Sequence, residues 1–160
     1  MSQSPAPVEP QRLNLYEVAP KLTNAYLHLE NAVRSSGIDA TLYELIKTRA
    51  SQLNGCAFCL DMHTKDARAA GETEQRLYAL NAWREIPLYT ERERAALALT
   101  EAVTLVSETH VPEDVWDDAS KVFSEEELAQ VLMAIVAING WNRMAIGTRQ
   151  AAGDYQPGQH

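Results

Sequence analysis

Two cysteines lie close together near the middle of the chain, and a histidine follows them. Cys56 and Cys59 are three positions apart in the segment ELIKTRASQLNGCAFCLDMH (residues 44–63), and His63 stands four positions after the second cysteine. Side chains three and four positions apart share one face of a helix. A thiol is nucleophilic only as the thiolate, and a neighbouring imidazole can take its proton. The spacing therefore indicates nucleophilic or redox chemistry at sulfur.

A glutamate before the cysteines is expected to lie beside the histidine. Gly55 follows an apolar-periodic run and is typical of a helix C-terminus, so Asn54 and Gly55 separate two predicted helices. Residues equidistant from the turn of an antiparallel hairpin lie at the same height, and Glu44 and His63 are equidistant from it. A carboxylate there orients the imidazole and favours its charged form. The hairpin predicts a Glu44/His63 pair; the alternative is a capping box, Thr41-x-x-Glu44, in which Glu44 only ties down the helix start.

The two cysteines have other interpretations. Free cysteines often pack as small buried hydrophobes, but a Cys-x-x-Cys pair at a helix start lowers thiol pKa and permits a disulfide. Zinc could take Cys56, Cys59, His63 and Glu44 as ligands, whereas most structural zinc sites use a second Cys or His pair, which the sequence lacks. A c-type haem needs a histidine directly after the second cysteine, where Leu60 stands. We therefore expect no cofactor and no metal at this site.

The pattern Glu44, eleven residues, Cys56-x-x-Cys59, three residues and His63 resembles the core motif of the AhpD-type alkylhydroperoxidases, part of the carboxymuconolactone decarboxylase superfamily. The resemblance covers residues 42–105 and extends more weakly over the rest of the chain. It implies an all-α fold, an AhpD-like helical bundle with a Cys-x-x-Cys helical hairpin, and assembly into trimers or hexamers. It also implies that Cys59 attacks a peroxide, that Cys56 resolves the product, and that Glu44 and His63 form the proton relay.

The function implied by this resemblance is that of a thiol-dependent peroxidase in antioxidant defence. Phe58 and Leu60 predict an apolar pocket, which favours organic hydroperoxides. A dithiol electron donor, lipoamide-like or thioredoxin-like, would reduce the Cys59/Cys56 disulfide. Phe58 stands where the best-known members have a second histidine, so a second hypothesis is a thiol-disulfide oxidoreductase. A third hypothesis is a non-catalytic redox sensor or zinc-binding module.

Composition excludes several classes of partner. The chain has 160 residues, 46% of them hydrophobic, with a net charge of -8 and an isoelectric point near 5.0. Such a chain buries a core without disulfides, and its negative charge disfavours nucleic acid and anionic membranes. The N-terminus MSQSPAPVEP does not resemble a secretory signal, so we expect a cytoplasmic protein. In that reducing compartment a Cys-x-x-Cys pair is more often catalytic than structural.

Hydrophobic periodicity predicts one helical domain at residues 13–153, between a flexible N-terminal arm at 1–12 and a flexible tail at 154–160. Capping boxes are expected at Thr90 and Ser124. The expected helices span residues 20–34, 41–53, 56–70, 73–84, 91–106 and 112–121, followed by a helix after Ser124 that contains residues 131–138. Amphipathic helices and three tryptophans favour self-association.

The sequence patterns predict structural roles for two further segments. Residues 131–138 form the most apolar segment and predict a central helix buried on nearly every side. The polar INGWNR run (residues 138–143) is expected to tie helix ends together, and the alternative is that it lines the active pocket or a subunit contact. His28 and Glu101 are each expected to be solvated, because they lie off the apolar face or on its flank.

Overall fold

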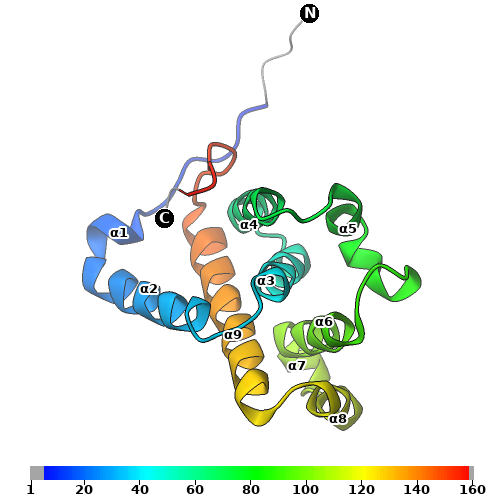
Figure 1. Cartoon of the computed structure of the whole chain (residues 1–160). Coiled ribbons are helices and arrows are strands. Elements are labelled where there is room, and N and C mark those ends of the chain that lie inside the picture. The colour runs from blue at the N-terminus through cyan, green and yellow to red at the C-terminus, as the bar shows by residue number, and fades with distance from the viewer. Residues whose placement is uncertain (1–5, 159–160) are drawn as a thin grey trace, which may run out of the picture.

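The structure is a computed structural model that describes residues 6–158. Every regular element within those residues is a helix, so the predicted all-α class is confirmed (Figure 1). In chain order the elements are α1 (Leu15–Val18), α2 (Pro20–Arg34), α3 (Ala40–Asn54), α4 (Ala57–Ala69), α5 (Glu74–Tyr78), the 3-10 helix η1 (Leu80–Glu85), α6 (Glu91–Thr104), α7 (Val106–Thr109), α8 (Glu113–Val122) and α9 (Glu125–Thr148).

Side-chain caps begin three of the main helices, and those of α6 and α9 lie where the sequence predicts. The carboxylate of Asp39 accepts a hydrogen bond from the backbone N–H of Leu42 at the start of α3. Thr90 and Ser124 each form a capping box, at the starts of α6 and α9. These caps satisfy backbone donors that a helix leaves unpaired in its first turn. Local sequence therefore determines where α3, α6 and α9 begin.

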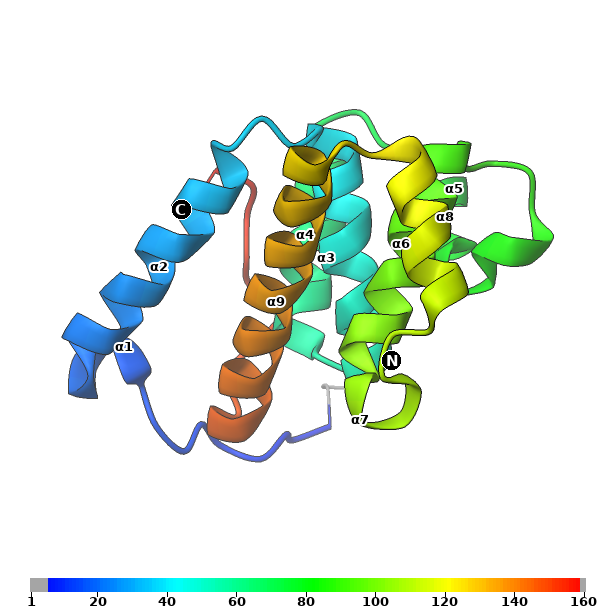
Figure 2. The same ribbon diagram turned by 90° about the horizontal axis from the view of Figure 1, so that it is seen from below.

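Helix α3 runs through the middle of the bundle. Helices α4, α6 and α9 pack around it, while α8 covers the outer side of α6 and α2 lies beyond α9 (Figures 1 and 2). Large apolar side chains of α3, α6 and α9 are fully buried where these helices meet: Leu45, Ile46, Leu97, Leu99, Ile135 and Ile138. A helix packed on several sides is held firmly, so α3 is a rigid base for side chains that it presents.

Helix α9 is less enclosed than its sequence suggests. Val131, Ile135 and Ile138 are buried, but Met133 and Val136 are 38% and 43% exposed. The expectation that residues 131–138 are buried on nearly every side is therefore wrong. The neighbouring helices cover part of the circumference of α9 and leave the face with Met133 and Val136 open.

The contact between α2 and α9 depends on a glycine. A Cβ atom at Gly140 would lie 1.9 Å from the hydroxyl oxygen of Tyr26. That hydroxyl donates a hydrogen bond to the carbonyl of Ala137 at 2.9 Å, and the ring of Tyr26 meets Trp141 edge to face, with centroids 4.7 Å apart. Gly140 thus allows α2 to approach α9 closely.

One predicted helix is divided in the structure, and another ends earlier than expected. The helix predicted at residues 73–84 is divided into α5 and η1, and Ala82 within η1 has non-helical backbone angles. The helix predicted to reach residue 106 ends at Thr104, and the short α7 follows. Apolar periodicity continues through both positions, so it cannot reveal a change of helix type or direction.

Segments near both ends of the described chain are hydrogen-bonded to the bundle. The backbone N–H of Arg12 donates to the carbonyl of Thr148 at 2.8 Å, and the ammonium of Lys65 donates to the carbonyl of Tyr155 at 2.8 Å. The parts of the predicted arm and tail at residues 1–5 and 159–160 lie outside the described residues. No helix among residues 6–158 is long and apolar enough to cross a membrane.

Candidate active site

The turn between α3 and α4 brings the cysteines to the start of a helix. Gly55 ends α3 in the left-handed conformation, with φ of 67°, which a residue with a side chain adopts only with strain. Cys56 follows as the N-cap of α4, one position earlier than the predicted first turn, and its sulfur accepts a hydrogen bond from the backbone N–H of Cys59 at 3.4 Å. The helix start therefore supplies a donor to the first sulfur.

The two cysteines are free thiols that touch each other. Their Sγ atoms are 2.8 Å apart, and the residues are only 1% and 3% exposed. Phe58 and Trp141, which are partly buried, pack against the cluster that contains them. Because both cysteines are buried, a solute reaches either sulfur only when groups around them move.

The two thiols have different pKa values because their surroundings differ. The pKa of Cys56 is lowered to about 7, first by the hydrogen bond from the Cys59 thiol and then by the backbone N–H of Cys59 and the side chain of Asn142, against the effect of burial. The pKa of Cys59 is raised, first by its hydrogen bond to Cys56 and then by burial and by the charge on Cys56. Cys56 is therefore the more acidic thiol of the pair, as helix-dipole reasoning also favours.

Glu44 and His63 are paired across the hairpin, as its symmetry predicts. The Nδ1 atom of His63 lies 2.9 Å from Oε2 of Glu44, and both side chains are largely buried. The capping-box alternative for Glu44 is wrong, because Asp39 occupies the N-cap of α3. With Nδ1 held by a carboxylate, Nε2 is the atom of His63 that remains to exchange a proton.

A buried ion pair lies on the next turn of α3. The ammonium of Lys47 is 2.8 and 2.7 Å from the two carboxylate oxygens of Glu30, and the Lys47 side chain is 0% exposed. Glu30 also accepts hydrogen bonds from Tyr43 and Trp141. The charge of Lys47 lowers the pKa of Cys59, so α3 contributes to the electrostatics of the thiols as well as to the relay.

The INGWNR run ties α9 to α3, as its polar side chains predict. Asn142 on α9 is 0% exposed. Its amide oxygen accepts a hydrogen bond from Asn54 at the end of α3 at 2.8 Å, and its nitrogen donates to the hydroxyl of Ser51 at 3.0 Å. The side chain of Asn142 also contributes to lowering the pKa of both thiols.

Glu101 differs from its expected position. It is not solvated but accepts hydrogen bonds from Trp83 and Arg49.

The structure does not bring together the four zinc ligands considered from the sequence. Among residues 6–158, the group that could hold a metal ion is Glu44, His63 and Asp66, whose ligand atoms lie within 4.8 Å of one another. Asp66 already accepts a hydrogen bond from the hydroxyl of Tyr155, and Glu44 is bonded to His63. The cysteines are absent from this group, so any metal there would occupy the proton relay rather than a structural cysteine site.

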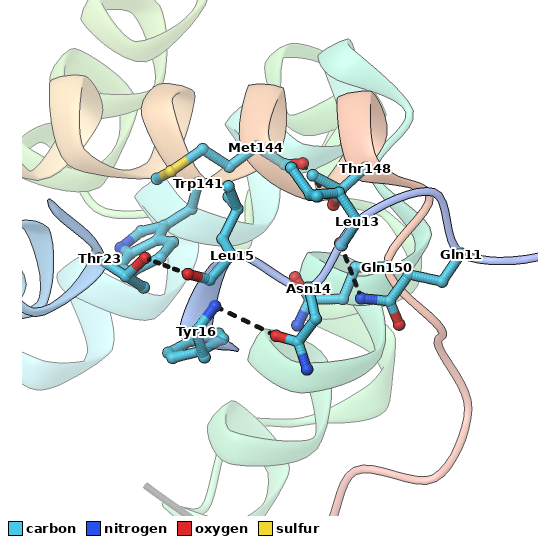
Figure 3. Close-up of a pocket in the computed structure, with 10 residues that line it drawn as sticks. All are labelled: Gln11, Leu13, Asn14, Leu15, Tyr16, Thr23, Trp141, Met144, Thr148 and Gln150. Atoms are coloured by element: carbon cyan, nitrogen blue, oxygen red, sulfur yellow. Dashed lines mark hydrogen bonds between the residues drawn. The ribbon is translucent and has the colours of Figure 1, made fainter. Parts of the chain in front are cut away.

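A cleft opens next to Glu44 of the Glu44/His63 pair. It has a volume of about 240 Å³ and is lined by Glu44 and Asp66 together with Arg34, Ile38, Ala40, Tyr43 and Ala70. A second cavity, shown in Figure 3, lies between the N-terminal segment, α1 and the end of α9, and its volume of about 30 Å³ suits a single water. No cysteine, histidine or carboxylate lines that second cavity. Of these two cavities, the larger one borders Glu44, and neither His63 nor a cysteine is among its lining residues.

Comparison with known proteins agrees with this geometry. A sequence model of the carboxymuconolactone decarboxylase family matches residues 20–102, a segment that contains α2, α3, α4 and both thiols. The chain belongs to the carboxymuconolactone decarboxylase family. Within it, the chain is 44% identical to the uncharacterized protein YdfG of Bacillus subtilis (strain 168) over 144 residues, which cover 89% of this chain and 98% of YdfG.

Solved structures of similar proteins share this fold. The crystal structure of ATU0492 from Agrobacterium tumefaciens, a protein of unknown function suggested to be the antioxidant defence protein AhpD, matches with a TM-score of 0.88 and 44% identity, covering 91% of this chain and 100% of that chain. The debrominase Bmp8 matches with a TM-score of 0.74 and 22% identity, covering 84% and 73%. At this identity the likeness to Bmp8 shows a shared fold alone.

Proposed function

We propose that the protein is a thiol-dependent peroxidase that reduces organic hydroperoxides in antioxidant defence. The observation that carries this proposal is the combination, on one hairpin, of two touching thiols and a buried Glu44/His63 pair. A nucleophilic sulfur, a second sulfur within bonding reach and a proton carrier are the three parts that a dithiol peroxidase needs. The family's AhpD-like member from Agrobacterium supports the same assignment.

In the proposed cycle, Cys59 attacks and Cys56 resolves. The Cys59 thiol first passes its proton to the Cys56 thiolate across the 2.8 Å contact, so that Cys59 becomes the thiolate. The Cys59 thiolate then attacks the terminal oxygen of the hydroperoxide; the S–O bond forms, the O–O bond breaks, and the alcohol leaves with a proton from His63. Sulfur is oxidised to the sulfenic acid and the peroxide is reduced. Glu44 holds the ring of His63 throughout.

Resolution and recycling use the second thiol and an external donor. The Cys56 sulfur attacks the sulfenic acid sulfur, which forms the disulfide and releases water. A dithiol donor, lipoamide-like or thioredoxin-like, reduces the disulfide and is itself oxidised, and both cysteines return as thiols. We place this cycle in the reducing cytoplasm, where such a donor is maintained.

The test is turnover of cumene hydroperoxide with dihydrolipoamide or reduced thioredoxin as the donor. Wild type consumes peroxide, and both Cys59→Ser and Cys56→Ser lose catalytic turnover with the dithiol. His28→Ala is the control, since His28 is exposed. Undiminished turnover in Cys59→Ser would refute the assignment of the attacking thiol.

A thiol-disulfide oxidoreductase is the second candidate function. Phe58 packs against the cluster that contains both cysteines, at a position where a second proton-relay group would help peroxide chemistry. The low pKa of Cys56 suits thiol exchange. Turnover of lipoamide disulfide or insulin, measured beside peroxide turnover on the same preparation, separates the two functions. Rapid disulfide turnover with negligible peroxide consumption would favour the oxidoreductase. Metal analysis of protein purified without chelator tests the non-catalytic zinc alternative.

The proposal includes a homo-oligomer, trimer or hexamer. Exposed apolar side chains on α2 and α9, among them Leu22, Val136 and Ile146, provide apolar surface for subunit contacts. Light scattering at micromolar concentration gives the mass directly, and a monomer mass would contradict this part of the proposal.

A further inference from the structure

One buried hydroxyl on α3 has no hydrogen-bond partner. The Thr48 side chain is 0% exposed, and no group within residues 6–158 forms a hydrogen bond with its Oγ1 atom. A threonine hydroxyl inside a helix can donate to the carbonyl four positions earlier, as Thr100 on α6 does to Ala96 at 2.7 Å. An unpaired buried hydroxyl costs stability, so its presence in a folded protein requires an explanation.

The Glu44/His63 pair lies on one side of Thr48. Glu44 stands four positions before Thr48 on α3, so their side chains share one face of that helix. His63 stands four positions after Cys59 on α4, so these two share a face as well. The 2.9 Å bond between Glu44 and His63 shows that the two faces meet. Four helical residues span about 6 Å, so Thr48 and Cys59 lie equally far along their helices from that bond.

The turn between α3 and α4 gives the same register on the other side. The backbone N–H of Cys56 donates to the carbonyl of Ser51 at 3.0 Å. Ser51 is three positions after Thr48. Cys56 is likewise three positions before Cys59. Thr48 and Cys59 are therefore opposite each other in the hairpin, between one observed contact on each side, and both are buried.

From this placement we propose that Thr48 is a catalytic residue whose hydroxyl binds the oxygen atom that a hydroperoxide transfers to Cys59. The inference rests on the proposed peroxidase function and adds a residue to it. In the reduced protein the Cys59 sulfur carries no oxygen, and the hydroxyl is unpaired. When the thiolate attacks, the S–O bond forms, the O–O bond breaks, and the alcohol leaves with a proton from His63. The oxygen of the new sulfenic acid then appears opposite Thr48.

A hydroxyl suits both protonation states of that product. It is a donor and an acceptor, so it donates to a sulfenate oxygen and accepts from a neutral sulfenic acid. Because Thr48 belongs to a packed helix, its hydroxyl needs little reorganisation when the oxygen arrives. Burial strengthens the bond, since the local dielectric constant is low. Thr48 thus holds the transferred oxygen while His63 protonates the leaving alcohol.

The test compares oxidation and alkylation at the same sulfur. In a Cys56→Ser background Cys59 is the remaining cysteine, and its sulfenic acid has no thiol to condense with. Its formation by cumene hydroperoxide is followed by dimedone trapping and mass spectrometry. We expect Thr48→Val, which replaces the hydroxyl by a methyl group, to slow this oxidation about tenfold or more, the effect of losing one hydrogen bond to a charged oxygen.

Two comparisons separate oxygen binding from a general disturbance of the site. Alkylation of Cys59 by iodoacetamide places no oxygen on the sulfur, so its rate should be the same with Thr48 and with Thr48→Val. Thr48→Ser keeps a hydroxyl and should retain most of the rate of oxidation. Unchanged oxidation in Thr48→Val, or a slowing equal to that of alkylation, would overturn the inference.

Thr100→Val is the matched control. Thr100 is also 0% exposed, but its hydroxyl is already bonded to Ala96, so this variant should oxidise Cys59 at the parent rate and gain no stability. Thr48→Val should raise the melting temperature of the reduced protein by a few degrees, because an unpaired buried hydroxyl is removed.

The melting temperature is also a test that needs no peroxide. A fall in Thr48→Val would show that the hydroxyl is paired in the reduced protein, which contradicts the inference. Failure of the parent protein to form a sulfenic acid would refute the proposed peroxidase, and the inference with it. That result is distinct from oxidation that proceeds equally well with and without the hydroxyl, which removes only the role of Thr48.

Discussion

The Nδ1 atom of His63 lies 2.9 Å from Oε2 of Glu44, although 19 positions separate the two residues in the chain. The contact follows from the hairpin, in which Gly55 ends α3 and reverses the chain so that α4 runs back along it. Both residues belong to rigid helices, and the pair is largely buried. A proton carrier positioned in this way needs little reorganisation during a reaction.

Removing the relay should slow peroxide reduction without unfolding the protein. We expect His63→Ala to lose roughly a hundredfold or more in turnover of cumene hydroperoxide, the usual contribution of general acid–base catalysis. Glu44→Gln should lose less, because the amide still holds the ring but does not stabilise its charged form. Steady-state kinetics with a fixed dithiol donor measure both. His110→Ala, which changes an exposed loop histidine, is the control, and equal losses in it and in His63→Ala would contradict the relay.

The pH dependence of alkylation should distinguish the two thiols. Since the pKa of Cys56 is lowered to about 7, its thiolate forms as the pH rises through that value, and its alkylation rate should rise with it. In Cys59→Ala the largest cause of the lowering is gone, so the midpoint of Cys56 should move upward toward the ordinary thiol value of about 8.5. In Cys56→Ala the pKa of Cys59 should fall, because its hydrogen bond to Cys56 was the largest cause of its rise.

Phe58 should control access to the sulfurs. Cys56 and Cys59 are buried, and Phe58 packs against them. At fixed pH, we expect Cys56 and Cys59 to be alkylated several-fold faster in Phe58→Ala than in wild type. The gain should be greater for a bulky maleimide than for iodoacetamide. Identical rates for both reagents in both proteins would show that solutes reach the sulfurs by another route.

The buried Glu30/Lys47 pair should be important for stability. Lys47→Met leaves the carboxylate of Glu30 buried with only neutral partners, and breaking such a pair costs about 3–5 kcal/mol of unfolding free energy. Urea denaturation at neutral pH measures this. The double change Glu30→Gln with Lys47→Met should recover much of the loss, because no unpaired charge remains. A single Lys47→Met variant as stable as wild type would be inconsistent with the buried charge pair.

Two glycines in α9 should respond in opposite ways to alanine. Gly140→Ala places a Cβ atom against Tyr26 and forces apart the contact between α2 and α9, which should cost about 1–3 kcal/mol. Gly147→Ala meets nothing within 4 Å and should stabilise the helix by up to about 1 kcal/mol. Thermal melting of the two variants beside wild type compares them directly.

Much of the hairpin could be predicted from local sequence. Cys56, Cys59 and His63 share a face because of helical spacing, and Glu44 reaches His63 because Gly55 marks the turn; both arguments use only distances along the chain. The capping boxes at the starts of α6 and α9 are equally local, and they were confirmed. The same approach failed at Ala82, where the change of backbone direction leaves no mark in the apolar pattern.

The remaining parts of the site depend on contacts between distant segments. Asn142 is hydrogen-bonded to Asn54, 88 positions before it, and Glu30 reaches Lys47 from another helix. No spacing rule relates such residues, because their separation depends on how whole helices pack.

The sequence by itself determined the helical class, the Cys-x-x-Cys pair, the Glu44/His63 pairing and the order of these residues along the hairpin, since these follow from backbone periodicity and turn chemistry. Only the tertiary structure decided that the sulfurs are covered, that Cys56 has the lower pKa of the pair, and that Asn142 of α9 is joined to Asn54 of α3. The physical reason is that burial and hydrogen-bond direction depend on surroundings built by α3, α4 and α9 together, and these act on acidity only after the helices have packed.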